Sequence, residues 1–192
     1  MKLRAHLFVP VLLIVCGASV AQAQESWDAG FKLVAANFSA ANGAGIGQSK
    51  NYGVAMFGTY LLSRRQSLEF DGGYRYFPTA TTVNGGFTQD DKTDGYYASA
   101  LYRWGFREDL YVHAGLRAAQ FRANSRTSYS DGTSSPTIKG AFTTGVRPLV
   151  GVGARLSDKY SVELNLVSFE TANISGNASS GTMVEAALAI HL

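Results

Sequence analysis

The chain has 192 residues, of which 46% are hydrophobic and 16% charged, and its formal net charge is +3. Two of the 17 basic residues, Lys2 and Arg4, lie in the N-terminal segment, so the remainder carries 15 basic against 14 acidic residues. This balance excludes the strongly basic surface of a nucleic-acid-binding protein, and the length suffices for one domain.

The N-terminal segment has the pattern of a secretory signal peptide. Lys2 and Arg4 precede an apolar run over residues 7–15, and Ala21-Gln22-Ala23 fits a cleavage site of small residues. The alternative is a membrane anchor, but the run is short for a helix that spans a bilayer. We therefore predict a signal peptide over residues 1–23 and one domain over 24–192. Cys16 is the one cysteine, so we expect the domain to contain no disulfide.

The stretch 68–76 shows the pattern that recurs through the domain. Leu68, Phe70 and Tyr74 alternate with charged or small residues, among them Glu69 and Asp71. Successive side chains of a strand point to opposite faces of the sheet, so this strand has one apolar and one charged face.

The same alternation predicts eight strands in chain order, and no segment shows a competing helical period. The predicted strands cover residues 27–38, 52–62, 68–76, 96–104, 110–118, 142–156, 162–166 and 184–192, with a typical length of about ten residues. Polar segments rich in Gly, Ser, Thr and Asn predict long loops over 40–50, 77–92, 122–140 and 170–181. Tight turns are predicted over residues 63–66, 105–109 and 157–159.

Long and short connections alternate, which in an antiparallel meander places all long loops at one end. The sequence thus predicts an all-β fold, an eight-stranded antiparallel up-and-down barrel. Short periplasmic turns and long extracellular loops are typical of outer-membrane barrels. A soluble lipocalin-like barrel, apolar inside and polar outside, shows the same alternation.

The composition of the two faces favours the membrane barrel. One face carries Val, Leu, Ala, Phe and Tyr with almost no charge, whereas the other mixes charges with Gly. Small residues beside long charged ones suit a narrow interior, and an uncharged band suits lipid. Aromatic residues near the strand ends are typical of interfacial girdles; they are Trp27, Tyr60 and Trp104 toward the short turns, and Phe38, Tyr52, Tyr76, Tyr96, Phe121, Phe142 and Phe169 toward the long loops.

The whole domain resembles, at the level of this pattern, the small eight-stranded bacterial outer-membrane barrels of the OmpA membrane domain and OmpX/Ail class. The alternating end, from Val184 to Leu192, is similar to the C-terminal assembly signal of such proteins but ends in Leu where that signal usually has Phe. The resemblance implies a bacterial outer-membrane location. It also implies three partners, namely outer-membrane lipid, lipopolysaccharide and the outer-membrane assembly machinery.

Charged residues of the inward face must neutralise one another, because unpaired buried charges are costly. We predict an interior polar cluster of Glu69, Asp71, Arg75, Arg103, Arg117, Arg147, Arg155, Glu163 and Glu185. Arg155 and Glu163 are expected to pair across the turn at 157–159, and Glu69 with Arg103 between neighbouring strands. Arg117 and Arg147 lie at similar depth and would repel each other unless an acid such as Asp71 or Glu185 reaches between them. This cluster is either a packed structural plug or a narrow ion path, and the small interior favours the plug.

The loops are the candidate binding elements, with Arg122, Arg126 and Lys139 flanking the third loop. They are candidate contacts for lipopolysaccharide phosphates, and the alternative is solvated surface charge. A host or cell-surface ligand is compatible with these loops, but the sequence does not identify one.

Catalytic and metal sites have weak support. Outer-membrane lipid A deacylases resembling PagL carry a His-x-Ser pair, but His113 is followed by Ala114-Gly115 and His191 is the penultimate residue. Residues 24–192 contain two distant histidines and no cysteine, which predicts no metal site, and no cofactor is expected. We therefore expect a non-enzymatic barrel with a structural or adhesin-like role. The alternatives are a lipid A-modifying acyl hydrolase with an unusual site and a narrow pore.

Overall fold

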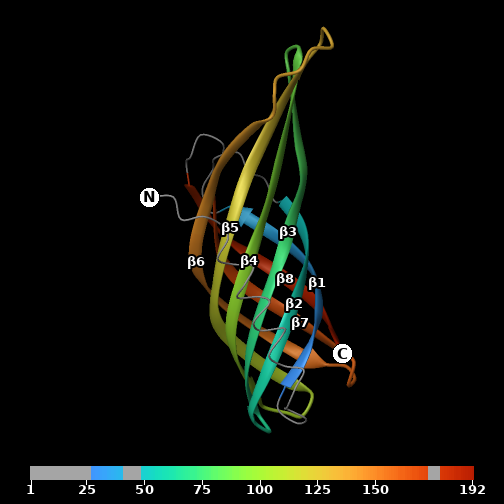
Figure 1. Cartoon of the computed structure of the whole chain (residues 1–192), viewed down its shortest axis with the longest axis vertical. Coiled ribbons are helices and arrows are strands. Elements are labelled where there is room, and N and C mark those ends of the chain that lie inside the picture. Colours follow the sequence, from blue (N-terminus) through green and yellow to red (C-terminus); the bar gives the residue numbers. More distant parts are fainter. Residues whose placement is uncertain (1–26, 41–48, 173–177) are drawn as a thin grey trace.

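The computed structural model describes residues 27–40, 49–172 and 178–192, so the predicted signal peptide lies outside the described residues. Eight antiparallel strands close into one barrel, each paired with its neighbours in chain order and β8 with β1 (Figure 1). The strands are β1 (Trp27–Ala40), β2 (Ser49–Ser63), β3 (Gln66–Asn84), β4 (Phe87–Gly105), β5 (Leu110–Tyr129), β6 (Ile138–Arg155), β7 (Tyr160–Ala172) and β8 (Ala178–His191). The predicted eight-stranded up-and-down topology is confirmed. Within the described ranges, no helix is long and apolar enough to cross a bilayer.

The register of the strands defines the geometry of the barrel. Trp27 on β1 is the Cα partner of Tyr60 on β2, and stepping from partner to partner across the following strands reaches Val184 on β8. The partner of Val184 on β1 is Asn37. Asn37 lies ten residues beyond Trp27, so the strands tilt relative to the barrel axis. This tilt brings side chains from distant strands together inside.

The two faces of each strand differ as the alternation predicts. Outward side chains are apolar and exposed, for example Phe31, Val54 and Leu164 at 44, 56 and 52%. Inward side chains on the same strands, such as Lys32 and Glu163, are 2 and 3% exposed. Such an uncharged outer band is suited to lipid, and closure of the ring leaves no free strand edge within it.

The hairpin of β3 and β4 corrects the predicted loop at 77–92. The two strands continue through this segment and are connected by Gly85 and Gly86, both with positive φ (42° and 109°). Asn84-Gly85-Gly86 is a tight hairpin signal that the composition of the segment obscured. The pairing shifts register between Phe77 and Ala80, where Pro78 has no N–H to donate.

The predicted loop at 122–140 is also largely strand, since β5 runs to Tyr129 and β6 begins at Ile138. In the connection, the Thr133 hydroxyl donates to Asp131 Oδ1 (2.6 Å), as does the Thr133 backbone N–H, and these bonds lower the Asp131 pKa. The strands are 13 to 20 residues long rather than about ten. Residues 41–48 and 173–177, which belong to the other two predicted loops, lie outside the described residues.

Strands β3–β6 extend beyond the rest of the barrel. Pairing of β2 with β3 reaches Tyr76, and β6 pairs with β7 over residues 149–155 and 161–167. Beyond these levels, residues 77–84, 87–94, 122–129 and 138–147 form a four-stranded extension, here called the projecting sheet. It rises at the end opposite the C terminus (Figure 1).

An apolar layer crosses the interior near the base of the projecting sheet. It consists of Ala36, Phe77, Leu101, Phe121, Leu149, Val167 and Met183. Phe121, predicted for the outer girdle, is instead 4% exposed and contacts Phe77 edge to face (centroids 5.8 Å apart). Phe121 is separated from the inward-facing His113 and Arg117 by an even number of residues, so it points to the same side of β5. The alternation of the strand, and not the aromatic side chain, therefore determines its orientation. Trp27, Tyr52, Tyr60, Tyr76, Tyr96, Trp104 and Phe142 are exposed, whereas the side chains of Phe38 and Phe169 lie outside the described part.

Candidate functional site inside the barrel

The charged side chains form two clusters inside the barrel. The lower cluster, nearer the short turns, contains Lys32 of β1, Glu69 and Asp71 of β3, Arg103 of β4 and Glu163 of β7. Lys32 Nζ lies 2.6 Å from Glu69 Oε1, 2.8 Å from Glu163 Oε2 and 3.6 Å from Asp71 Oδ2. Arg103 contacts both glutamates. The lower cluster thus contains two cations and three carboxylates, and these five side chains come from four strands.

Neighbouring polar side chains complete the lower cluster. The Tyr111 hydroxyl donates to Glu163 Oε1 (3.0 Å), and the Thr59 hydroxyl donates to Glu69 Oε2 (3.4 Å). Tyr111 has room because Gly153 faces its ring, and a Cβ there would lie 2.2 Å from Tyr111 Cζ. Bonds to several donors offset the desolvation of these carboxylates, as a buried charge requires.

The upper cluster consists of Arg75 of β3, Arg117 of β5 and Glu185 of β8. Arg117 lies 2.6 Å from Glu185 Oε2, and Arg75 contacts the same oxygen. Asn165 donates to Glu185 Oε1 (3.0 Å). The Tyr97 ring lies 4.9 Å from the Arg75 guanidinium carbon and 4.3 Å from that of Arg117. Two guanidinium groups therefore share one carboxylate and one aromatic ring.

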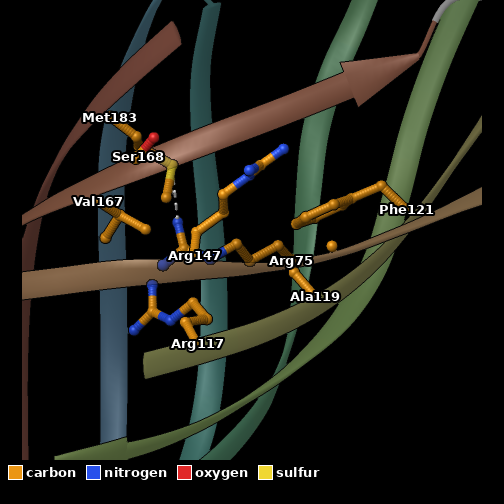
Figure 2. Close-up of a pocket in the computed structure, with 9 residues that line it drawn as sticks. Arg75, Arg117, Ala119, Phe121, Arg147, Val167, Ser168 and Met183 are labelled. Carbon is orange, nitrogen blue, oxygen red and sulfur yellow. Dashed lines mark hydrogen bonds between the residues drawn. The ribbon is translucent and has the colours of Figure 1, made fainter. Parts of the chain in front are cut away.

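A small cavity adjoins the upper cluster. Its volume is about 20 Å³, and its lining includes Arg75, Arg117, Arg147, Phe121 and Met183 (Figure 2). Arg147 is the Cα partner of Arg117, so three arginines from β3, β5 and β6 border one space. Met183 Sδ lies 3.3 Å from an Arg75 NH group.

A third group of polar side chains closes the mouth near the short turns. Ser161 Oγ lies 2.9 Å from His191 Nε2, and His191 Nδ1 lies 2.6 Å from Asp28 Oδ2. This is the hydrogen-bond order of a Ser–His–Asp triad. Ser161 is only 1% exposed, so its hydroxyl is closed to a substrate carbonyl in this conformation. The arrangement can connect β1, β7 and β8, where the barrel closes.

The predicted residues separate into these groups. Glu69 and Arg103 are in contact, and Glu185 reaches Arg117. The expected pair of Arg155 and Glu163 is wrong: the Arg155 side chain is 49% exposed and lies 3.6 Å from Asp28. Arg155 ends β6 at the mouth, where its long side chain leaves the interior.

The interior also holds several polar residues that the sequence-based prediction did not include. Lys32, Asn51 and Asn165 are all inward by alternation, and parity alone would have found them. Asn51 Oδ1 accepts from Arg75 (2.9 Å), and Asn165 Oδ1 lies 2.5 Å from His113 Nε2. In the described part of the chain, no three His, Cys, Asp or Glu side chains group as metal ligands.

The candidate lipopolysaccharide contacts all lie on the projecting sheet. Arg122 stacks over Phe142, with its guanidinium carbon 4.8 Å from the ring centroid. Arg126 donates to Ser134 Oγ (3.0 Å), and Lys139 is exposed as the Cα partner of Asn124. By register, Arg122 and Arg126 lie opposite Asp94 and Asp90 on β4. The surface therefore carries mixed charge rather than a purely basic patch.

Comparison with known proteins identifies the fold. No family model matches the chain, and no curated protein matches it. Among solved structures, Neisserial surface protein A (NspA) is similar at a TM-score of 0.54 and 13% identity, covering 89% of this chain and 99% of that protein. Ail, the attachment invasion locus protein of Yersinia pestis, is similar at a TM-score of 0.52 and 12% identity (88% and 100%). Ail in complex with the heparin analogue sucrose octasulfate gives a TM-score of 0.52 at 10% identity (87% and 98%). The chain has the fold of small eight-stranded outer-membrane barrels.

Proposed function

We propose that this protein is a non-enzymatic barrel of the bacterial outer membrane that presents the projecting sheet for surface interactions. The observation that carries the proposal is the continuation of β3–β6 beyond the outward apolar band, as one ordered sheet. A barrel that served only to fill the membrane would not need strands of up to 20 residues. The fold similarity to Ail and NspA supports the barrel class.

A shortened hairpin tests the surface role. Ala80 and Asp91 are Cα partners, so residues 81–90 can be replaced by an Asn-Gly turn without disturbing the barrel below. We expect the variant to retain a heat-dependent shift in gel migration while adhesion of expressing cells to epithelial surfaces is lost. Unchanged adhesion would contradict the role of the hairpin, and a protein found in the soluble periplasm would contradict the membrane location.

We also propose that Arg122, Arg126 and Lys139 contact lipopolysaccharide phosphates. They lie on β5 and β6 beyond the apolar band, and cationic side chains form strong bonds to phosphate. Neutralising all three to Gln should weaken binding to lipopolysaccharide but not to its dephosphorylated form. The matched control neutralises Arg64, Arg65 and Lys159, which are exposed at the short turns.

The lipopolysaccharide assay separates two outcomes. Loss of phosphate-dependent binding in the first triple variant alone supports the contact. Equal binding by wild type and both variants contradicts it. Sucrose octasulfate, the probe bound in the Ail complex, serves as a second polyanion that distinguishes sulfated sugar from lipid phosphate.

A further inference from the structure

One row of outward side chains crosses four strands at the base of the projecting sheet. Tyr76 of β3, Asp94 of β4, Arg122 of β5 and Phe142 of β6 are successive Cα partners, here called the base row. The next outward side chain of β4 toward the barrel is Tyr96, which is 61% exposed. The base row therefore lies where the outward surface changes from apolar and aromatic to charged side chains, which is the level of the lipid headgroups.

Two cations at the base row are held against aromatic rings. Lys92 Nζ of β4 lies 5.2 Å from the centroid of the Tyr76 ring, and the guanidinium carbon of Arg122 lies 4.8 Å from that of Phe142. Lys92 thus leans toward β3 and Arg122 toward β6, so the two positive charges diverge. Within the described part of the chain, neither cation forms an ion pair with a carboxylate.

The separation of these charges favours an elongated ligand. Neighbouring strands lie about 4.8 Å apart, so the rings on β3 and β6 are three spacings, or about 14 Å, from each other. A single phosphate group is too small to reach both cations across this distance. The base row therefore suits a ligand with one anionic group at each end.

The middle of the base row favours hydroxyl groups over a third anion. Asp94 lies between the two cations, and Asn124 donates to its Oδ1 (3.2 Å). An ionised carboxylate repels a phosphate placed beside it but accepts hydrogen bonds from hydroxyl groups. A sugar that carries a phosphate at each end meets both conditions.

We propose that Lys92 and Arg122 each bind one of the two phosphates of the lipid A headgroup, whose disaccharide spans the base row. Lipid A carries these phosphates at opposite ends of its disaccharide and at the surface of the hydrocarbon layer. Each cation donates a charge-assisted hydrogen bond to one phosphate, and Asp94 accepts from a sugar hydroxyl. This assignment rests on the proposed lipopolysaccharide contact, adds Lys92 to it and specifies one bisphosphorylated headgroup as the ligand.

Lipid A with two phosphates and lipid A with one phosphate are the probes. The refolded full domain in neutral detergent receives both at equal concentration, and native mass spectrometry measures the ratio in which they bind. The wild type should prefer the bisphosphorylated form about tenfold, the effect of one charge-assisted hydrogen bond. Lys92→Gln and Arg122→Gln should each bind the two forms equally.

Two further variants separate the base row from general charge attraction. Lys50 is exposed on β2 as the Cα partner of Asn37, so Lys50→Gln removes the same charge outside the row and should keep the wild-type preference. Tyr76→Leu keeps every charge but removes the ring under Lys92, and it should lower the preference. A heat-dependent gel shift must show that each variant is folded.

The outcomes distinguish this site from the broader lipopolysaccharide contact. Loss of the preference in Lys92→Gln and Arg122→Gln, but not in Lys50→Gln, supports the site. An equal loss in all three would overturn it. Equal binding of both lipids by the wild type would also overturn it, while the triple variant of Arg122, Arg126 and Lys139 still tests the broader contact. No binding of either lipid by the wild type would overturn both proposals.

Discussion

At the residue scale, Glu163 connects three other strands through the lower cluster. Its carboxylate is bonded by Lys32, Arg103 and Tyr111, from three different strands. Each of these side chains would lose a charged acceptor if the carboxylate were neutralised. The lower cluster is therefore a cooperative network, in which the loss of one carboxylate weakens several interactions at once.

We expect Glu163→Gln to destabilise the folded barrel by about 3 kcal/mol, the order found when one partner of a buried ion pair is removed. Urea unfolding in lipid vesicles measures this as a lower midpoint. Glu108→Gln removes the same charge from the exposed turn between β4 and β5, and its midpoint should match the wild type. Equal midpoints for both variants would show that the lower cluster contributes little to stability.

Ser161 should be inert as a nucleophile, although it bonds to His191 as a catalytic serine would. Its side chain is buried against the barrel wall, so a fluorophosphonate should not label the native protein. Ser161→Ala should cost about 1 kcal/mol, because it removes one hydrogen bond at the closing strands. Labelling of Ser161 that disappears in His191→Ala would instead support the acyl-hydrolase alternative.

At the element scale, the width of the barrel depends on glycines where large inward side chains face a neighbouring strand. Gly153 on β6 faces the Tyr111 ring on β5, whereas Gly58 on β2 points outward, with Trp27 Cζ3 3.9 Å from the position of a Cβ. The same substitution should therefore have different effects at the two sites.

Gly153→Ala should destabilise the barrel by about 1–3 kcal/mol, the usual cost of overpacking, because Tyr111 must move from its bond to Glu163. Gly58→Ala makes only an ordinary contact and should be neutral within about 0.5 kcal/mol. Unfolding midpoints of the two variants in the same vesicles give the comparison. A neutral Gly153→Ala would mean that Tyr111 repacks freely.

The alternation of side chains divided each strand into two faces, because its period is fixed by backbone geometry, and the composition of the two faces then predicted which of them is buried. It was not sufficient to predict partners across the interior. Arg155 and Glu163 share parity across a short turn, yet Glu163 pairs with Lys32 of β1. That contact depends on the ten-residue displacement around the ring, which is set by all eight pairings together.

At the scale of the whole molecule, two charged clusters and one apolar cluster fill the barrel interior, and the apolar cluster contacts the upper charged cluster through Met183. The lower cluster, the upper cluster and the apolar layer around Leu101 and Phe121 draw side chains from strands on all sides. An eight-stranded barrel has an interior that side chains fill. The packed plug is therefore favoured over the narrow pore.

We expect the wild type to show no stable single-channel conductance in planar bilayers at 1 M salt. Neutralising Arg117 should not create a conductance, because the contact between Arg75 and Glu185 still fills the interior at this level. The same preparation must show the heat-dependent gel shift of a folded barrel, so that silence does not reflect unfolded protein. A stable conductance that changes with Arg117→Gln would favour the pore.

The orientation of the barrel gives a further prediction at this scale. The projecting sheet ends in the Gly85-Gly86 turn, whereas the turn at Asp158 lies at the other mouth, near the C terminus. An epitope inserted between Gly85 and Gly86 should bind antibody on intact cells, because the strands that carry this turn extend far beyond the barrel, and in barrels of this fold the longer extensions face outward while the end without them faces the periplasm. The same epitope after Asp158 should bind only after the outer membrane is permeabilised. The reverse pattern would place the projecting sheet in the periplasm and remove the basis for a surface role.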